Sequence, residues 1–336
     1  MEADIYPWQN DYWNKFLILK KRLPNAILFY GNTGIGKLNF SYNISKSLLC
    51  KNLTEKMFAC NICSSCILFK KNNHPDFRFL RPEFNEIKAT ENKKKDSLEK
   101  VSSIIKIEQV RSLTNFLNLS THRLGHKIIL IYPSEKLTTY SANALLKILE
   151  EPTGDTLFLL VCHSIDKLPL TIRSRCHLFH MKTPKEEFST RWLEEKGIKN
   201  VELKIKEFGG SPLSLLESLT SDKNYLSKDY IEFLTNPNKS KIISFSEKNQ
   251  KIPLEKIILW HQKWIYDLFF FKVSGRTVFF PAYQDKLKKI SLNLTMDKIL
   301  FLINDTSKKK LIVSHPISQR LFVEELMLCY FENCFE

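Results

Sequence analysis

A glycine-rich loop directly after a short apolar run is the feature that most constrains the fold of this chain. The apolar run, AILFY, occupies residues 26–30, and the loop carries Gly31, Gly34, Gly36 and Lys37 in the spacing G-x-x-x-x-G-K. Glycines let backbone N–H groups turn toward phosphate oxygens, a following helix offers its positive N-terminus, and the lysine reaches the terminal phosphates. We therefore predict a strand, a phosphate-binding loop (P-loop) and a helix in this order.

One position of this loop departs from the pattern. A Ser or Thr hydroxyl should follow the lysine to hold Mg²⁺, and this chain has Leu38 there. The other seven of the eight expected positions are present, so the P-loop fold is predicted. Whether the loop still acts on nucleotide is a separate question.

The composition is that of a globular protein with several domains. The 336 residues are 43% hydrophobic and 26% charged, which allows two or three domains with cores of their own. The first residues, MEADIYP, lack the basic and apolar parts of a signal peptide, and no run approaches the roughly 18 apolar residues of a membrane span. We therefore expect a cytoplasmic protein without membrane contact, in which the eight cysteines stay reduced.

The chain is strongly basic, with a net charge of +15 and a pI near 9.3. Lysine and arginine bind nucleic-acid phosphates by releasing counterions, so this charge favours proximity to DNA. The lysines are scattered rather than clustered, as in proteins from A/T-biased genomes. Charge alone therefore does not indicate that the chain reads DNA sequence.

Four of the eight cysteines lie close together in the sequence. Cys50, Cys60, Cys63 and Cys66 follow the spacing C-x9-C-x2-C-x2-C. Pairs of this kind bring thiolates around one ion, and four thiolates complete the closed tetrahedron of a structural Zn²⁺ site. The alternatives are a redox pair and a chance cluster. His74 is a further potential ligand, but four cysteines already suffice.

Strand and helix patterns alternate along about the first half of the chain. Helices are predicted at 7–22, 39–49, 107–118 and 140–150, and strands at 26–30, shortly after residue 74, at 127–132 and at 156–162. This alternation predicts a parallel α/β sheet. Beyond residue 181 the pattern is helical, with a break at Gly209 and Gly210 and aromatic stripes that indicate packing surfaces. Residues 81–100, rich in Lys, Glu and Asn, predict a solvated loop.

Four stretches together resemble one family. They are RLPNAILF at 22–29 before the P-loop, the cysteine cluster that begins at Cys50, NALLKILEEP at 143–152 and LPLTIRSRC at 168–176. In these motifs the chain is similar to the clamp-loader subunits of bacterial DNA polymerase III, which belong to the AAA+ ATPase class. The resemblance covers residues 5–217, and beyond them only the helical character and the segment QRLFVEEL at 319–326 are similar to the family's collar domain.

Three departures separate this chain from the ATP-hydrolysing motor subunits of the family. Motor subunits have Ser or Thr at the position of Leu38, an acidic pair at the position of Tyr132 and Pro133, and a sensor arginine at that of Leu213. Without the hydroxyl and the acidic pair, neither Mg²⁺ nor an attacking water is held. The resemblance therefore implies a non-hydrolysing subunit with a degenerate P-loop, and we do not expect this chain to bind ATP.

An arginine that the family uses is retained. In the motif Ser174-Arg175-Cys176, the family's arginine faces outward and completes the ATP site of a neighbouring motor subunit, as an arginine finger in trans. A guanidinium suits this role because it is always charged and forks onto phosphate oxygens. The alternative is a surface salt bridge. The neighbouring Arg173 is the weaker candidate.

The resemblance also implies an architecture and partners. Residues 1–181 would form an AAA+ P-loop domain with a zinc module at 50–75, residues 182–222 a small helical lid, and residues 223–336 an all-helical collar. The expected partners are motor (gamma/tau-type) and delta subunits in a hetero-oligomeric ring that opens the sliding clamp and places it on primed DNA. The alternatives are an active motor ATPase of the same complex and a free-standing zinc-containing DNA-binding protein.

Overall fold

The computed structural model describes residues 5–83, 104–119, 126–152, 154–220, 224–250, 252–313, 315 and 317–335. The chain divides into two compact units, Met1–Phe188 and Ser189–Glu336. Most of the predicted solvated loop at 81–100 lies outside the described residues. Among the described residues, no helix is long and apolar enough to cross a membrane.

The first unit is built on a parallel sheet, as the sequence predicts, and this sheet has a fifth strand in addition to the four that were predicted. The strands are β1 (Ala26–Tyr30), β2 (Phe77–Leu80), β3 (Lys127–Ile131), β4 (Thr156–Cys162) and β5 (His177–His180). Their order across the sheet is β2-β3-β4-β1-β5, and every neighbouring pair is parallel. Because parallel strands end at the same edge, the residues that follow β1, β3 and β4 meet there.

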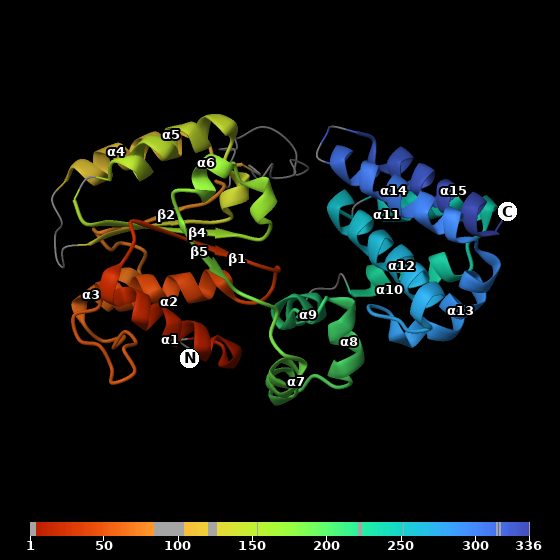
Figure 1. Ribbon diagram of the computed structural model, residues 1–336, viewed down its shortest axis with the longest axis horizontal. Coiled ribbons are helices and arrows are strands. Elements are labelled where there is room, and N and C mark those ends of the chain that lie inside the picture. The colour runs from red at the N-terminus through yellow and green to blue at the C-terminus, as the bar shows by residue number, and fades with distance from the viewer. Residues whose placement is uncertain are drawn as a thin grey trace, which may run out of the picture. The chain divides into compact units, whose positions relative to one another are not determined.

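Helices cover both faces of this sheet (Figure 1). The helices of the first unit are α1 (Asn10–Leu19), α2 (Lys37–Leu49), α3 (Ser64–Lys70), α4 (Ile107–Asn118), α5 (Thr139–Glu150) and α6 (Leu170–Arg173), with short 3-10 turns η1 (Pro7–Gln9), η2 (Lys20–Arg22), η3 (Ser134–Lys136) and η4 (Ile165–Lys167). Helices α4, α5 and α6 pack on one face, and α1 and α2 on the other.

Side chains of each strand alternate between these two layers. Leu28 of β1 packs with the α4 and α5 side chains, whereas Ile27 and Phe29 pack with those of α1 and α2. Successive residues of a strand point to opposite faces, and both faces here are covered. The near-continuous apolar runs of β1, β3 and β4 are therefore buried on both sides.

The second unit contains helices and no strand among its described residues. It comprises α7 (Glu186–Glu195, which begins in the first unit), α8 (Val201–Glu207), α9 (Pro212–Thr220), α10 (Asn224–Thr235), α11 (Ile242–Asn249), α12 (Leu254–Ser274), α13 (Gln284–Asn293), α14 (Met296–Ile312) and α15 (Gln319–Phe335), with the turns η5 (Lys239–Lys241) and η6 (Pro281–Tyr283). Its buried apolar residues form two clusters, one within 193–215 and a larger one within 230–334. The boundaries drawn between P-loop domain, lid and collar stay predictions.

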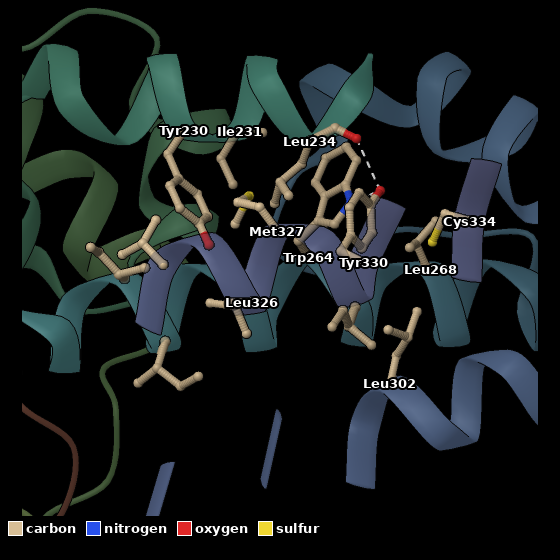
Figure 2. Packing of buried hydrophobic residues seen from close by; sticks show 14 of the residues in the cluster. Tyr230, Ile231, Leu234, Trp264, Leu268, Leu302, Leu326, Met327, Tyr330 and Cys334 are labelled. Carbon is tan, nitrogen blue, oxygen red and sulfur yellow. Dashed lines mark hydrogen bonds between the residues drawn. The ribbon is translucent and has the colours of Figure 1, made fainter. Parts of the chain in front are cut away.

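Aromatic residues of the stripes predicted beyond residue 181, such as Trp264 of α12 and Tyr330 of α15, lie within the larger cluster (Figure 2). Trp264 of α12 donates its indole N–H to the Tyr330 hydroxyl at 2.8 Å, and this hydroxyl donates to the Leu234 carbonyl at 2.9 Å. Both aromatic side chains are fully buried, so their polar atoms need these partners. The interpretation of the stripes as core packing surfaces is confirmed.

Candidate functional site

The predicted P-loop lies between β1 and α2. Gly34 and Gly36 have φ angles of +74° and +85°, a left-handed conformation that glycine adopts without strain. Gly36 is the N-cap of α2. A Cβ atom at Gly36 would lie only 2.5 Å from the ring of Tyr6, so no other residue fits beneath that ring. The loop thus has the backbone conformation that the motif predicts, and the ring of Tyr6, from the N-terminal segment, lies against it.

Polar side chains of the N-terminal segment hold the loop backbone. The indole N–H of Trp8 donates to the Ile35 carbonyl at 3.0 Å. The Gln9 amide donates to the carbonyls of Ile35 and Gly36 at 3.1 and 3.0 Å. Tyr6 stacks on Trp8, with ring centroids 4.9 Å apart. This segment therefore holds the loop backbone at Ile35 and Gly36.

The P-loop lysine turns back into its own loop. The ammonium of Lys37 donates to the carbonyls of Gly31 and Asn32 at 2.7 and 2.5 Å, and lies 3.1 Å from Nδ1 of His163. Lys37 is 2% exposed. Burial lowers the pKa of Lys37 to about 8, although Cys162 and Glu135 favour its charged form. The lysine therefore stays protonated at neutral pH and has acceptors for all three of its N–H groups.

Two residues near Lys37 were not predicted. His163 directly follows β4 and contacts Tyr132 after β3, with Nε2 and Oη 3.2 Å apart. Its backbone N–H donates to Oε1 of Glu135, on the turn after β3, at 2.9 Å. Their positions in the sequence could have indicated them, because residues that directly follow adjacent parallel strands lie at the same edge of the sheet. Leu38 meanwhile packs against the apolar cluster that contains α1 and α2.

The four predicted cysteines come together. Their sulfur atoms all lie within 4.8 Å of one another, and Cys50 Sγ is 3.5 Å from that of Cys60 and 3.9 Å from that of Cys63. Four thiolates about 2.3 Å from a central Zn²⁺ would be about 3.8 Å apart. The sulfur positions are therefore close to those of a tetrahedral site, and the residues fit this ion.

Backbone N–H groups point at these sulfur atoms, as they do around bound thiolates. The N–H groups of Cys60, Cys63 and Cys66 donate to the sulfur atoms of Cys50, Cys60 and Cys63 at 3.2–3.4 Å. Burial would raise the pKa of Cys63, but N–H donors from Cys66 and Lys51 lower it to about 6. Burial and the adjacent thiols raise the pKa of Cys66. Without a cation, four adjacent thiols cannot all ionise.

The cysteine module is anchored on α1 and α2, and His74 supports it from outside. Trp13 stacks on Phe58 with ring centroids 4.4 Å apart, and the Trp13 indole N–H donates to the Lys56 carbonyl at 3.1 Å. His74 is buried with Nε2 2.7 Å from the Ser65 hydroxyl, and it does not belong to the cysteine cluster. His74 therefore positions the segment and is not one of the clustered ligands.

The predicted arginine lies near the carboxyl-terminal end of α6. Arg175 donates to the Thr171 carbonyl at 3.0 Å and pairs with the carboxylate of Glu150, the last residue of α5. Its side chain is 36% exposed. Arg173 lies 3.8 Å from Asp166 and is 26% exposed, so it is the more buried of the two. The flanking Cys176 is buried, and burial raises its pKa to about 12.

The parallel sheet, the P-loop after its strand β1 and the helical second unit define a member of the AAA+ P-loop class. Within that class the chain belongs to the DNA polymerase III delta subunit family, whose model matches residues 9–185.

Two relatives that are similar in sequence agree with this assignment. The DNA polymerase III subunit delta' of Pseudomonas aeruginosa is 35% identical over 216 residues, which are 63% of this chain and 60% of the relative. The subunit delta' of Buchnera aphidicola subsp. Baizongia pistaciae is 27% identical over 300 residues, 85% of this chain and 84% of the relative. A solved structure of a DNA polymerase III gamma subunit-related protein from Thermotoga maritima aligns over 97% of this chain and 99% of its own, with 17% identity and a TM-score of 0.45.

Proposed function

We propose that this chain is the non-hydrolysing delta-prime subunit of a DNA polymerase III clamp loader, working in a ring with motor and delta subunits. The observation that carries the proposal is the composition of the nucleotide edge of the sheet. Leu38 packs into an apolar cluster where a Mg²⁺-binding hydroxyl would be needed, and Tyr132 binds His163 where an acidic side chain would be needed. At these two positions, phosphoryl transfer would lack the hydroxyl that binds the metal and the carboxylate that holds metal and water.

The place of Arg175 on the surface supports its proposed role in this ring. It is held at the end of two helices by Thr171 and Glu150 and remains partly exposed, so its guanidinium can exchange an intramolecular partner for a phosphate. Arginine is suited to this exchange because its charge is permanent and its donors form a fork. In the proposed ring, Arg175 completes the ATP site of a neighbouring motor subunit, with Ser174 and Cys176 fixing the turn that presents it.

The cysteine module serves the same subunit structurally. Cys50, Cys60, Cys63 and Cys66 would hold one Zn²⁺, whose closed coordination leaves no position for water and whose contribution is folding free energy. The helices of the second unit would supply the lid and the collar that joins the ring.

Reconstitution tests the proposed function. The full chain, co-expressed with the motor and delta subunits of its source, should enter one complex that loads a labelled sliding clamp onto primed DNA. Omission of this chain should abolish loading. A ring that assembles and loads clamps equally well without the chain contradicts the proposal, and so does robust ATP turnover by the purified chain alone.

A further inference from the structure

The P-loop lysine has no N–H group left for a phosphate. An ammonium carries three N–H donors and no acceptor, and those of Lys37 are directed to the carbonyls of Gly31 and Asn32 and to Nδ1 of His163. In a loop that binds nucleotide, this lysine reaches the terminal phosphates. Lys37 therefore occupies the arrangement that competes with phosphate binding.

His163 is held in the orientation that accepts from Lys37. Since Nδ1 accepts a hydrogen bond from the ammonium, the ring proton of the neutral imidazole is on Nε2 and points to the Tyr132 hydroxyl, 3.2 Å away. Burial and the adjacent ammonium lower the pKa of His163 to about 4, so the ring is neutral at pH 7. The backbone of His163 is fixed by Glu135 at 2.9 Å.

Release of Lys37 toward a phosphate would leave these groups without their partner. The carbonyls of Gly31 and Asn32 and Nδ1 of His163 would each lose a charge-assisted hydrogen bond. A Mg²⁺ ion bound with the phosphate could offset this loss, but Leu38 provides no hydroxyl to bind it. A nucleotide phosphate would therefore have to compete with these three acceptors for the ammonium of Lys37.

We infer that Tyr132 and His163 form a lock that holds Lys37 inside its own loop, and that this lock excludes nucleotide from the P-loop. His163 and Tyr132 are positioning residues, because they act through Lys37. The inference rests on the proposed non-hydrolysing role and deepens it, since it names the residues that keep the loop closed. If only a small fraction of the chain has the lock open, a variant that opens it fully should bind nucleotide more tightly by a factor equal to the inverse of that fraction.

Equilibrium binding of a fluorescent ATP analogue with Mg²⁺ to the full chain tests the lock. The unmodified chain should not saturate at millimolar nucleotide. His163→Thr removes the acceptor of Lys37 and should tighten binding about tenfold or more. Tyr132→Phe removes only the hydroxyl that orients the imidazole and should give a smaller gain in the same direction. Addition of Lys37→Ala to either variant should abolish its gain.

His177→Thr is the matched control, because His177 is an exposed histidine on β5, away from the lock, and should leave binding unchanged. Acylation of Lys37, read by mass spectrometry in the unmodified chain, gives a second measurement that needs no variant, and ATP should not change its rate. Protection of Lys37 by ATP, micromolar binding by the unmodified chain, or no gain in both lock variants overturns the inference. Binding without turnover would overturn the lock alone, whereas turnover would overturn the proposed function.

Discussion

The guanidinium of Arg175 pairs with the carboxylate of Glu150, so the last residue of α5 holds the residue two positions beyond α6. Both side chains are partly exposed, at 36% and 48%. An exposed ion pair contributes little to stability because water and salt screen it. The ion pair orients the guanidinium of Arg175 but is weak enough to be exchanged for another partner. A substitution of Arg175 should therefore affect its proposed role in the ring much more than the folding of the chain.

Arg175→Ala should leave the chain folded and impair the assembled ring. Loss of one exposed pair should change the free energy of unfolding by less than about 1 kcal/mol. Arginine fingers accelerate their own site by roughly 10³ to 10⁵, but other intact sites in the ring would make the overall loss of DNA-stimulated ATP hydrolysis smaller. Arg175→Lys should be nearly as slow because the fork is lost.

The matched control is Arg191→Ala, since Arg191 is an exposed arginine that also pairs with a glutamate, Glu195, at 3.4 Å. It should leave the ring's activity unchanged. Arg173→Ala should be milder than Arg175→Ala, with some loss of stability because Arg173 is more buried. A ring with Arg175→Ala that hydrolyses ATP and loads clamps at the unmodified rate rules out the assignment.

Glu150→Gln distinguishes action in trans from a local structural role. The substitution removes the charge that pairs with Arg175 and keeps the size of the side chain. If Arg175 acts on a neighbour's phosphate, the variant ring should retain its ATP hydrolysis. If Arg175 acts only by holding Glu150, then Glu150→Gln and Arg175→Ala should slow the ring equally. Steady-state hydrolysis by the two rings, with primed DNA present, decides between them.

Removal of the metal should loosen the cysteine module and spare the sheet. We expect one Zn²⁺ per chain, and structural zinc contributes on the order of 10 kcal/mol to the segment that binds it. Chelation or Cys60→Ser should speed hydrogen exchange across residues 50–75 and alter Trp13 fluorescence, since Trp13 stacks on Phe58 of the module. Cys329→Ser, outside the cluster, is the control. Well under one equivalent of zinc in freshly purified, reduced protein contradicts the site.

His261 should make the second unit sensitive to acid. Burial, together with the charge of Lys309, lowers the pKa of His261 to about 3, although Asp305 acts in the opposite direction. The imidazole, whose Nδ1 lies 3.1 Å from the Tyr230 hydroxyl, therefore stays neutral while the unfolded chain protonates near pH 6.5. Between these values the unfolded state binds more protons, so stability is complete above pH 6.5 and is lost as the pH falls.

This single histidine should lower the free energy of unfolding by roughly 2 kcal/mol between pH 7 and pH 5. Urea unfolding at the two pH values, for the unmodified chain and for His261→Gln, measures it as the difference between the two pH dependences. His177→Gln, at an exposed position, should retain the full pH dependence. Identical pH dependences for the unmodified chain and His261→Gln would exclude this origin.

The strands and the cysteine cluster could be predicted because each depends on local sequence. The strands at 127–131 and 156–162 are apolar runs buried on both faces, and the C-x2-C spacing brings thiols together wherever the turn forms. Strand β5 gave no such signal, since in His177-Leu-Phe-His only Phe179 is buried. Its identity comes from pairing with β1, a contact between distant parts of the chain.

The contacts of Lys37 could be predicted only in part. The loop itself follows from glycine spacing, but the partner His163 is 126 residues away and carries no motif of its own. Only the rule that adjacent parallel strands end together would place it beside Tyr132. Whether the lysine then faces a phosphate or its own carbonyls depends on side-chain geometry that periodicity does not determine.

Leu38→Thr should not restore ATP hydrolysis. The new hydroxyl would supply one Mg²⁺ ligand, but Tyr132 and Pro133 still provide no carboxylate for the metal or for water. Lys37 would also remain bound to the carbonyls of its own loop. Phosphate release by the purified variant should therefore equal that of a Lys37→Ala preparation, which measures contaminating ATPase.

The stability of this variant needs a control, because Leu38 packs partly buried against the apolar cluster of α1 and α2. Leu48→Thr, a partly buried leucine of the same helix and cluster, should show a similar loss of about 1 kcal/mol and no turnover. If Leu38→Thr alone hydrolyses ATP well above the Lys37→Ala background, the missing hydroxyl was the single defect. The chain would then be a motor ATPase one substitution away from activity, and the non-hydrolysing role would have to rest on Leu38 alone.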